Sequence, residues 1–289
     1  MTSTTLQLSN FPYGRDGILS YREVGPRNLR QGDPLVLIHG VGMQSAAWGP
    51  QIECFSQSMR VIALDMPGHG GSSPLPKGAQ LPEYVQWLFA ALTALDTGPV
   101  NLAGHSMGAL IAGGFAISFP QLTRRVAVLN GVHQRSVDAR AAVEARSVQI
   151  DAAQLDNGKI DIEAPLTRWF SDSESDQIAR EMVRTWLQAI DLEGYATAYG
   201  AFARGDQTYA SRWSEVECPM LALTGDGDPN STPKMSQAMA SSAQNGRAEV
   251  LAGHRHMVNL TAPEAVNRIL SQWLAMPTPI NSDPEGEIE

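Results

Sequence analysis

The sequence of 289 residues has only two cysteines, Cys54 and Cys218, which lie far apart in the chain. Nothing marks them as a disulfide pair, so we expect two buried free thiols in a reducing cytoplasm. The longest apolar run, from Ala109 to Phe119, is too short and too interrupted by glycine to cross a bilayer. Residues 1–10 have no basic start and no apolar core, so we expect no signal peptide. These absences predict a cytoplasmic protein.

Positive charge is also scarce. The formal net charge is −9, and no cluster of lysine and arginine is present. We therefore expect neither nucleic acid nor an anionic membrane as a partner. Hydrophobic residues make up 43% of the chain, which allows a large core in one or two domains. No internal repeat is found.

Short apolar runs alternate with segments of helical spacing through much of the chain. The predicted strands are Ile18–Val24, Pro34–Ile38, Val61–Leu64, Val100–Ala103, Arg125–Leu129, Pro219–Thr224 and Ala248–Leu251. The predicted helices among them are Pro82–Leu95, Ala109–Phe119 and Ala262–Ala275. A continuous apolar run such as Pro34–Ile38 is typical of a strand buried on both faces. The alternation predicts an α/β fold, a mostly parallel doubly wound sheet with helices on both faces.

The pattern changes between residues 133 and 213, where no strong strand signal occurs. Four helices are predicted there, Val137–Asp156, Glu163–Phe170, Ser175–Leu192 and Gly194–Gly205. An insertion of about 80 residues is longer than an ordinary connection between strands. We therefore predict a core of residues 1–132 and 214–276, and a helical insertion of residues 133–213. The acidic segment 277–289, rich in proline and serine, is expected to be disordered.

The pentapeptide from Gly104 to Gly108 places Ser106 between a predicted strand and a predicted helix. Strand, Gly-x-Ser-x-Gly and helix is the context of a nucleophile elbow. The serine of such a turn has a strained backbone, and glycines on either side avoid clashes with the adjoining elements. The following helix directs its unpaired N–H groups at the serine, which favours an oxyanion there. The stretch predicts a nucleophilic serine.

A serine hydroxyl needs a base within hydrogen-bond reach, and the base needs an acid that orients it. The candidate bases are His39, His69, His105, His133, His254 and His256. His105 adjoins the serine in a tight turn and is expected to point away from it. His39 is expected to support a glycine-bearing loop, and His69 to be a structural loop residue.

Two stretches late in the chain supply the candidate acid and the candidate base. Asp226 and Asp228 follow the predicted strand after the insertion, and His254 follows a later strand and a glycine. The order serine, acid, histidine is that of the nucleophile-elbow hydrolases. A His254-x-His256 pair could also hold a metal, but no third ligand cluster accompanies it, so we expect neither metal nor cofactor.

Across nearly its whole length the chain resembles the α/β-hydrolase superfamily. The resemblance rests on Leu37–Gly42, Asp65–Gly70, Gly104–Gly108, Gly225–Pro229 and Gly253–His254. It implies the α/β-hydrolase fold, with Ser106 as nucleophile, Asp228 as acid and His254 as base. It also implies an oxyanion hole formed by the backbone N–H groups of Val41 and Met107.

Two alternatives stay open within this triad. Asp226 could be the acid, although the acid of the family usually ends this G-x-x-D turn, which favours Asp228. His256 could be the base, although His254 is preferred because it follows Gly253 directly.

The insertion resembles the family's helical cap, which covers the pocket and sets specificity. Short stretches around Arg168, Tyr195 and Phe202 resemble the cap of 3-oxoadipate enol-lactonase-type hydrolases. A weaker similarity, at Asn130-Gly131 and Val258–Thr261, is to the aminoacrylate and carbamate hydrolases of pyrimidine breakdown.

Four cap residues are predicted to contact substrate: Arg168, Trp169, Tyr195 and Phe202. Arg168 and Arg204 could hold a substrate carboxylate by paired N–H bonds. The alternative is that both arginines lie on solvated helix faces and that the aromatic residues belong to the core.

The sequence therefore predicts a cofactor-free serine hydrolase of a small carboxylic ester, lactone or related acyl compound. The alternatives are a C–C bond hydrolase of a ring-cleavage diketone and an amide or carbamate hydrolase. A receptor that has kept the pocket without catalysis is a further alternative of a different class. A small-molecule substrate is the expected partner, and the chain is expected to be a monomer or a homodimer.

Overall fold

The computed structural model describes residues 2–11, 15–26, 33–156 and 158–278. The strands of this part of the chain are β1 (Thr4–Phe11), β2 (Arg15–Val24), β3 (Leu35–Ile38), β4 (Val61–Leu64), β5 (Val100–His105), β6 (Thr123–Leu129), β7 (Met220–Gly225) and β8 (Gly246–Leu251). They form one eight-stranded sheet in the order β1-β2-β4-β3-β5-β6-β7-β8. All neighbouring pairs from β4 to β8 are parallel, and β1 and β2 form an antiparallel edge. The predicted fold class is confirmed.

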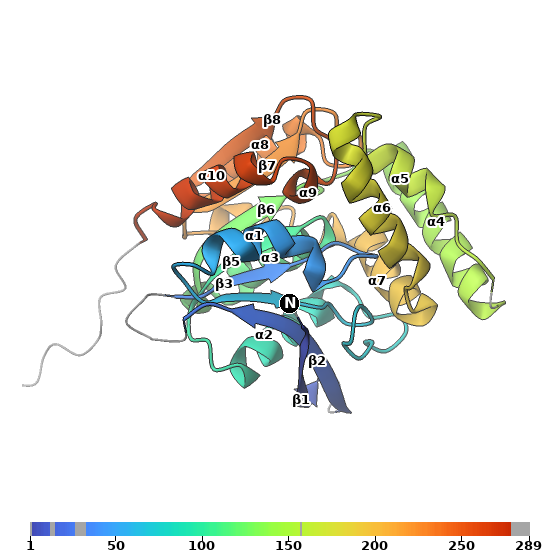
Figure 1. Ribbon diagram of the computed structural model, residues 1–289, viewed down its shortest axis with the longest axis horizontal. Helices are drawn as coiled ribbons and strands as arrows, with labels where there is room; N and C mark the ends of the chain where they lie inside the picture. Colours follow the sequence, from blue (N-terminus) through green and yellow to red (C-terminus); the bar gives the residue numbers. More distant parts are fainter. Residues whose placement is uncertain (1, 12–14, 27–32, 157, 279–289) are drawn as a thin grey trace, which may run out of the picture.

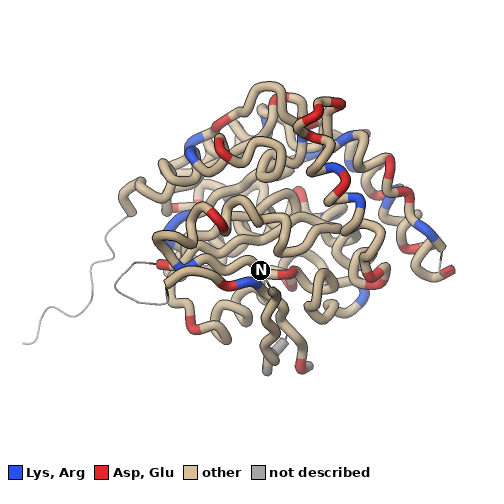
Figure 2. The backbone as a smooth tube through the Cα atoms, viewed as in Figure 1, with Lys and Arg blue, Asp and Glu red and all other residues tan. Residues whose placement is uncertain are grey.

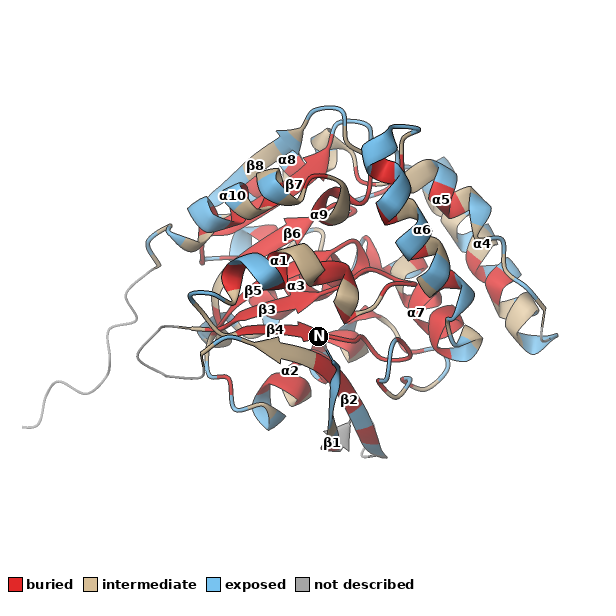
Figure 3. Ribbon diagram, in the orientation of Figure 1, coloured by how far each residue is buried: buried red, intermediate tan, exposed pale blue. Residues whose placement is uncertain are grey.

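Helices cover both faces of this sheet (Figure 1). They are α1 (Gly49–Phe55), α2 (Leu81–Ala94), α3 (Met107–Ser118), α4 (Val137–Leu155), α5 (Glu163–Trp169), α6 (Glu174–Gln188), α7 (Leu192–Gly205), α8 (Pro233–Ser242), α9 (Val258–Thr261) and α10 (Pro263–Leu274). Alternate residues of a central strand face opposite layers. Val36 packs in one cluster with Phe115 of α3, and Leu37 packs in another with Ile52 of α1 and Trp273 of α10. The central strands are accordingly buried on both sides (Figure 3).

The predicted strands and helices lie within a few residues of their expected positions. The sequence did not predict β1, α1, α8 or α9. Helix α8 is hard to recognise because only Ser236, Met239 and Ala240 of it are buried, which leaves little apolar periodicity. Charged residues lie mainly on the helices and loops that surround the sheet (Figure 2).

Helices α4 to α7 connect β6 to β7 and form the helical insertion (Figure 1). Helix α7 packs against α4 on one side and reaches α2 of the sheet layer on another. Of the predicted acidic tail, only residues 277 and 278 are described, and the rest lies outside the described residues. None of the described helices is both long and apolar enough to span a membrane.

Both cysteines are free, but only one of them is buried. Burial raises the pKa of the Cys218 thiol to about 12, which keeps it protonated and unreactive at neutral pH. The expectation that Cys54 is buried is wrong, because its position on the short helix α1 faces solvent.

Two buried imidazoles tie together the loops that follow β3 and β4. His39 Nδ1–H donates to the Gly40 carbonyl at 2.8 Å, and its Nε2 accepts from the Met66 N–H at 2.9 Å. His69 Nδ1–H faces the Pro67 carbonyl at 3.1 Å, and its Nε2 accepts from the Gly42 N–H at 2.9 Å. Each ring therefore needs one protonated and one unprotonated nitrogen. The supporting role expected for His39 and the structural role expected for His69 agree with this arrangement.

These rings predict that the protein loses stability in mild acid. Burial lowers the pKa of His69 to about 3 and also lowers the pKa of His39. In the unfolded chain the pKa of histidine is about 6.5, so below that pH the unfolded chain binds more protons than the folded protein does. The free energy of unfolding therefore falls as pH falls. Each such histidine contributes a slope of up to about 1.4 kcal/mol per pH unit.

Thermal unfolding followed between pH 8 and pH 4 measures this effect. The His69→Gln variant, whose amide can accept from Gly42 without titrating, should show a lower melting temperature at pH 8 and a shallower fall in acid. Parallel curves for variant and wild type would contradict the assignment of the slope to His69.

Candidate active site

Ser106 occupies a sharp turn between β5 and α3. Its backbone has φ 55° and ψ −114°, a left-handed conformation that is strained for any residue with a side chain. A Cβ added to Gly108 would clash with the Ile38 carbonyl of β3, and one added to Gly104 would clash with the backbone of Gly108. The two glycines are therefore required by backbone packing on both sides of the serine. The strained turn and its glycines are those expected from the sequence.

Ser106 Oγ, the His256 imidazole and the Asp228 carboxylate form a continuous hydrogen-bonded chain. His256 Nε2 lies 3.1 Å from Ser106 Oγ, and His256 Nδ1 lies 2.8 Å from Asp228 Oδ2. All three residues are buried, with 7%, 3% and 2% of the residue surface exposed for Ser106, His256 and Asp228. The arrangement can transfer a proton from the hydroxyl to an imidazole that a carboxylate orients.

The expectation that His254 faces Ser106 is wrong. The His254 carbonyl accepts from the N–H of Gly227, directly after β7, while its ring lies 3.3 Å from Thr261 Oγ1. The loop that leaves β8 therefore lies above β7 at residue 254. Strand β7 is two strands from β5, which carries the serine, and the two strands are about 10 Å apart. Two residues later the loop has crossed β6 and placed His256 against the serine.

The two candidate acids also have separate roles. Asp228 faces His256, whereas Asp226 is exposed and its Oδ1 accepts from the N–H of Gly253 at 2.8 Å. Asp226 therefore fixes the turn that begins the histidine loop. The placement of Asp228, preferred from the sequence, agrees with the geometry.

Asn130, at the end of β6, is a site residue that the catalytic motifs did not reveal. Its Nδ2 donates to Asp228 Oδ2 at 2.8 Å and lies 3.2 Å from both Thr224 Oγ1 and the Arg255 carbonyl. The side chain is fully buried and the backbone has φ 48°. Asn130-Gly131 directly after a predicted strand is the sequence signal that could have identified it, because asparagine adopts a left-handed backbone more readily than most residues.

Burial by itself would raise the pKa of Asp228. The charge and hydrogen bond of His256, the Asn130 amide and the N–H of Asn230 outweigh this effect and hold the pKa of Asp228 below its usual value. The carboxylate therefore stays ionised beside the imidazole at neutral pH, as the orientation of His256 Nδ1–H requires.

His105 also supports the site from beneath, although it does not reach Ser106 Oγ. Its Nε2–H donates to the carbonyl of His256 at 2.8 Å. Burial lowers the pKa of His105 to about 3, so the ring is neutral. Because the elbow and the histidine loop meet through this bond, His105 holds the backbone of His256 above β5.

The inserted helix α5 holds the histidine loop from the opposite side. Arg255 Nη1 donates to the carbonyls of Thr167 and Phe170, both at 2.9 Å. The N–H of His256 donates to the Trp169 carbonyl at 3.2 Å, and the two rings stack with centroids 5.7 Å apart. The position of His256 thus depends on contacts from the insertion as well as from the sheet.

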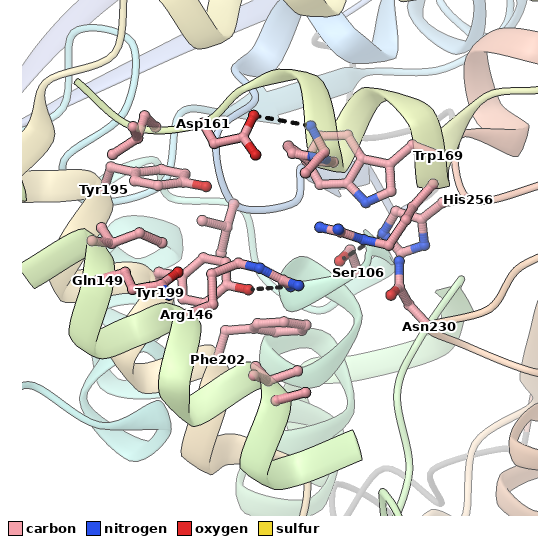
Figure 4. Close-up of a pocket in the computed structure, with 18 of the residues that line it drawn as sticks. Ser106, Arg146, Gln149, Asp161, Trp169, Tyr195, Tyr199, Phe202, Asn230 and His256 are labelled. Atoms are coloured by element: carbon pink, nitrogen blue, oxygen red, sulfur yellow. Dashed lines mark hydrogen bonds between the residues drawn. The ribbon is translucent and has the colours of Figure 1, made fainter. Parts of the chain in front are cut away.

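The triad opens on a cavity of about 550 Å³ between the sheet and the insertion (Figure 4). Ser106, His256 and Val41 line one part of it, and residues of α4, α5 and α7 line the rest. The four residues predicted to contact substrate, Arg168, Trp169, Tyr195 and Phe202, all lie on its wall.

Arg204 does not share the cavity wall with Arg168, and for Arg204 the alternative of a solvated helix face agrees with the structure. Arg204 is exposed, and its Nε donates to Gln80 Oε1 at 2.8 Å outside the cavity. The other arginines on the wall are Arg135 and, on α4, Arg146, which no motif indicated.

Val41 and Met107 occupy positions suited to an oxyanion hole. Met107 is the first residue of α3, directly after Ser106, and Val41 lines the cavity beside the serine. Their roles remain predictions. Among the described residues, no three His, Cys, Asp or Glu side chains gather as a metal site.

A buried nucleophile, imidazole and carboxylate at the carboxyl edge of a parallel sheet are the features of a serine hydrolase. The sequence of residues 35–269 matches the "Alpha/beta hydrolase family", and the chain belongs to this family. It is therefore an enzyme of the hydrolase class.

Individual relatives show which kinds of hydrolase the chain resembles. The chain is 52% identical over 274 residues to the (E)-2-((N-methylformamido)methylene)succinate hydrolase of Acinetobacter baylyi, covering 95% of this chain and 98% of that protein. It is 27% identical to 3-oxoadipate enol-lactonase 2 of the same species, over 81% of this chain and 85% of that protein. A thermophilic esterase of Thermogutta terrifontis has the same fold, with a TM-score of 0.83, 23% identity, and coverage of 94% of this chain and 98% of the other.

These findings support a hydrolase that resembles the enol-lactonase type. The alternative reactions, C–C bond hydrolysis and amide or carbamate hydrolysis, fit the 52%-identical relative better than the predicted ester or lactone hydrolysis does.

The contacts of Arg255 predict that its removal loosens His256. In Arg255→Met the loop loses two charge-assisted bonds to α5, and the rate at which a fluorophosphonate labels Ser106 should fall by about 10- to 100-fold. Second-order labelling rates measure the effect. The control is Arg212→Met, which removes an exposed arginine paired with Glu215 and should label at the wild-type rate. Equal rates for both variants would show that α5 does not position His256.

Proposed function

We propose that the chain hydrolyses an acyl C–N bond in a small carboxylate compound, with Ser106 as nucleophile, His256 as base and Asp228 as the acid that orients it. The hydrogen-bonded chain from Ser106 through His256 to Asp228 carries this proposal. The amide and the succinate in the name of the 52%-identical relative support the substrate class. An N-formyl enamine of a dicarboxylic acid is the substrate that best combines these features.

In the proposed mechanism, Ser106 Oγ attacks the formyl carbon while its proton passes to His256 Nε2. The developing oxyanion accepts from the backbone N–H groups of Val41 and Met107. Collapse of the tetrahedral intermediate breaks the C–N bond, and His256 returns the proton to the departing nitrogen. Water then attacks the formyl ester, gives its proton to His256 and releases formate, after which His256 returns the proton to Ser106.

The buried carboxylate of Asp228 stabilises the imidazolium in both steps without taking its proton. The Asn130 amide and the His256 imidazole both donate to Asp228 Oδ2, and the N–H of Asn230 donates to Asp228 Oδ1. These bonds to both oxygens hold the carboxylate in a fixed orientation toward His256.

We also propose that residues 133–213 act as a cap over a core of residues 1–132 and 214–276. The cap closes the cavity with α4, α5 and α7, and it excludes bulk water from the acyl intermediate until the leaving amine departs. A small-molecule substrate is the partner that this cavity of about 550 Å³ fits.

Ester or lactone hydrolysis by the same triad is the second candidate, because an acyl-enzyme would form in either case. The 27%-identical enol-lactonase supports it. An amide demands a protonated leaving nitrogen, so the two reactions differ in how much they depend on the imidazole as an acid.

Formate release from a ring-opened N-formyl enamine dicarboxylate tests the reaction and its base. Ser106→Ala and His256→Ala should each lower kcat by about 10⁴- to 10⁶-fold. His254→Ala, the matched control two residues away, should keep kcat within a few fold. Loss of turnover in His254→Ala but not in His256→Ala would reverse the assignment, and the absence of formate from wild-type enzyme would reject the amide reaction.

The acid is tested by a second pair of variants. Asp228→Asn should lower kcat by about 10⁴-fold, because the amide imposes the wrong tautomer on His256. Asp226→Asn keeps an oxygen that can accept from Gly253 and should lower kcat far less. Circular dichroism of both variants checks that each is folded, and an equal loss in the two would contradict a catalytic role for Asp228 alone.

A further inference from the structure

The cavity is strongly cationic although the chain as a whole is acidic. Among the described residues, its wall carries the cations Arg135, Arg146, Lys159 and Arg168, and a single carboxylate, Asp161. The whole chain has a formal net charge of −9. An excess of positive charge gathered in one cavity attracts anions and repels cations.

Among the cations on the wall, Arg135 is already paired with a carboxylate of the protein. Its Nη1 lies 3.2 Å from Asp206 Oδ1, and the guanidinium carbon lies 4.4 Å from the centre of the Phe202 ring. Asp206 also accepts from Arg140, and its side chain is fully buried. Arg135 therefore belongs to a structural ion pair beneath α7.

Arg168 lacks such a partner. Its Nε is buried without a hydrogen-bond partner, and its side chain makes no hydrogen bond or ion pair to any residue that the structure describes. Burial lowers the pKa of Arg168, and the positive charge of Arg146 lowers it further; the hydroxyls of Tyr199 and Tyr195 and the carboxylate of Asp161 only partly offset this. Leaving a half-buried cation near a like charge is unfavourable unless an anion binds there.

Arg146 is the neighbour that acts on Arg168. It reaches from α4 into the cavity, and its Nη1 donates to Tyr199 Oη at 3.1 Å (Figure 4). It has no carboxylate partner among the described residues. The hydroxyl of Tyr195, whose pKa burial raises, is close enough for the charges of both arginines to act on it. The two cations and two tyrosines thus lie together on the cavity wall.

We propose that Arg146 and Arg168 together bind one carboxylate of the substrate, and that this carboxylate subsite selects dicarboxylate over uncharged acyl compounds. The anion lies between two guanidinium groups that otherwise repel each other, and it accepts charge-assisted hydrogen bonds from both. Tyr199 holds Arg146 in place from the side remote from the anion. The subsite rests on the proposed function only in that the bound carboxylate belongs to the molecule cleaved at Ser106.

Binding of 2-methylenesuccinate, which has no acyl C–N bond to cleave, tests the subsite independently of catalysis. Isothermal titration calorimetry should show that wild-type protein binds this dianion, with an affinity that falls at high salt. Arg146→Gln and Arg168→Gln should each weaken binding by about 10- to 100-fold. Arg204→Gln, the matched control on α7 outside the cavity, should bind as wild type does. The uncharged dimethyl ester of the same acid should bind at least 10-fold more weakly to wild type and should not distinguish the variants.

Thermal unfolding without ligand gives a second readout. Removing an arginine that takes part in a structural ion pair lowers the melting temperature, whereas Arg168→Gln should leave it unchanged or raise it because a repulsion is lost. Wild-type affinity in both cavity variants, an absence of binding by wild type, or a loss of affinity in Arg204→Gln equal to theirs would overturn the subsite. Because no bond is cleaved, failure of the subsite leaves the proposed amide hydrolysis standing, and failure of formate release leaves the carboxylate subsite standing.

Discussion

The imidazole of His256 has to bridge two strand ends that are not neighbours in the sheet. Ser106 follows β5 and Asp228 follows β7, with β6 between them. The loop that carries His256 leaves from β8, three strands from the serine and about 14 Å away. The loop must therefore run back over two strands before it can present a ring to the hydroxyl. The rest of the site supplies hydrogen bonds along the loop and holds the position of His256 at its far end.

Anchors along the loop fix each stage of that crossing. In the first turn of the loop, the Asp226 carboxylate accepts a hydrogen bond from the N–H of Gly253. Above β7, the N–H of Gly227 donates to the carbonyl of His254. Asn130, at the end of β6, donates to the carbonyl of Arg255. His105, at the end of β5, then donates from Nε2–H to the carbonyl of His256. The ends of β7, β6 and β5 in turn therefore each supply hydrogen bonds to the passing loop.

The helical insertion contacts the proposed base and also lines the cavity. The carboxyl end of α5 binds Arg255 and the N–H of His256, while Arg168 of the same helix faces the cavity. One short helix thus contacts the proposed base and lines the space where substrate would lie. Helix α5 therefore joins the wall of the cavity to the loop that carries the proposed base.

Much of this arrangement was predictable, because local packing dictates it. The strained serine needs glycine on both sides, and parallel strands need continuous apolar runs, so Gly104, Ser106 and Gly108 and the sheet were recognisable in the sequence. The choice between His254 and His256 was not, because it depends on how far a loop travels across the sheet. Spacing along α7 did not show that Arg204 turns outward to Gln80.

The central claim is that residue 256, and not residue 254, donates to Asp228. Proton NMR at low temperature measures it most directly, because an imidazole Nδ1–H bound to a buried carboxylate resonates far downfield. The account predicts one such resonance that disappears in both Asp228→Asn and His256→Gln and persists in His254→Gln. A downfield resonance that is lost in Asp228→Asn but survives in His256→Gln would contradict it.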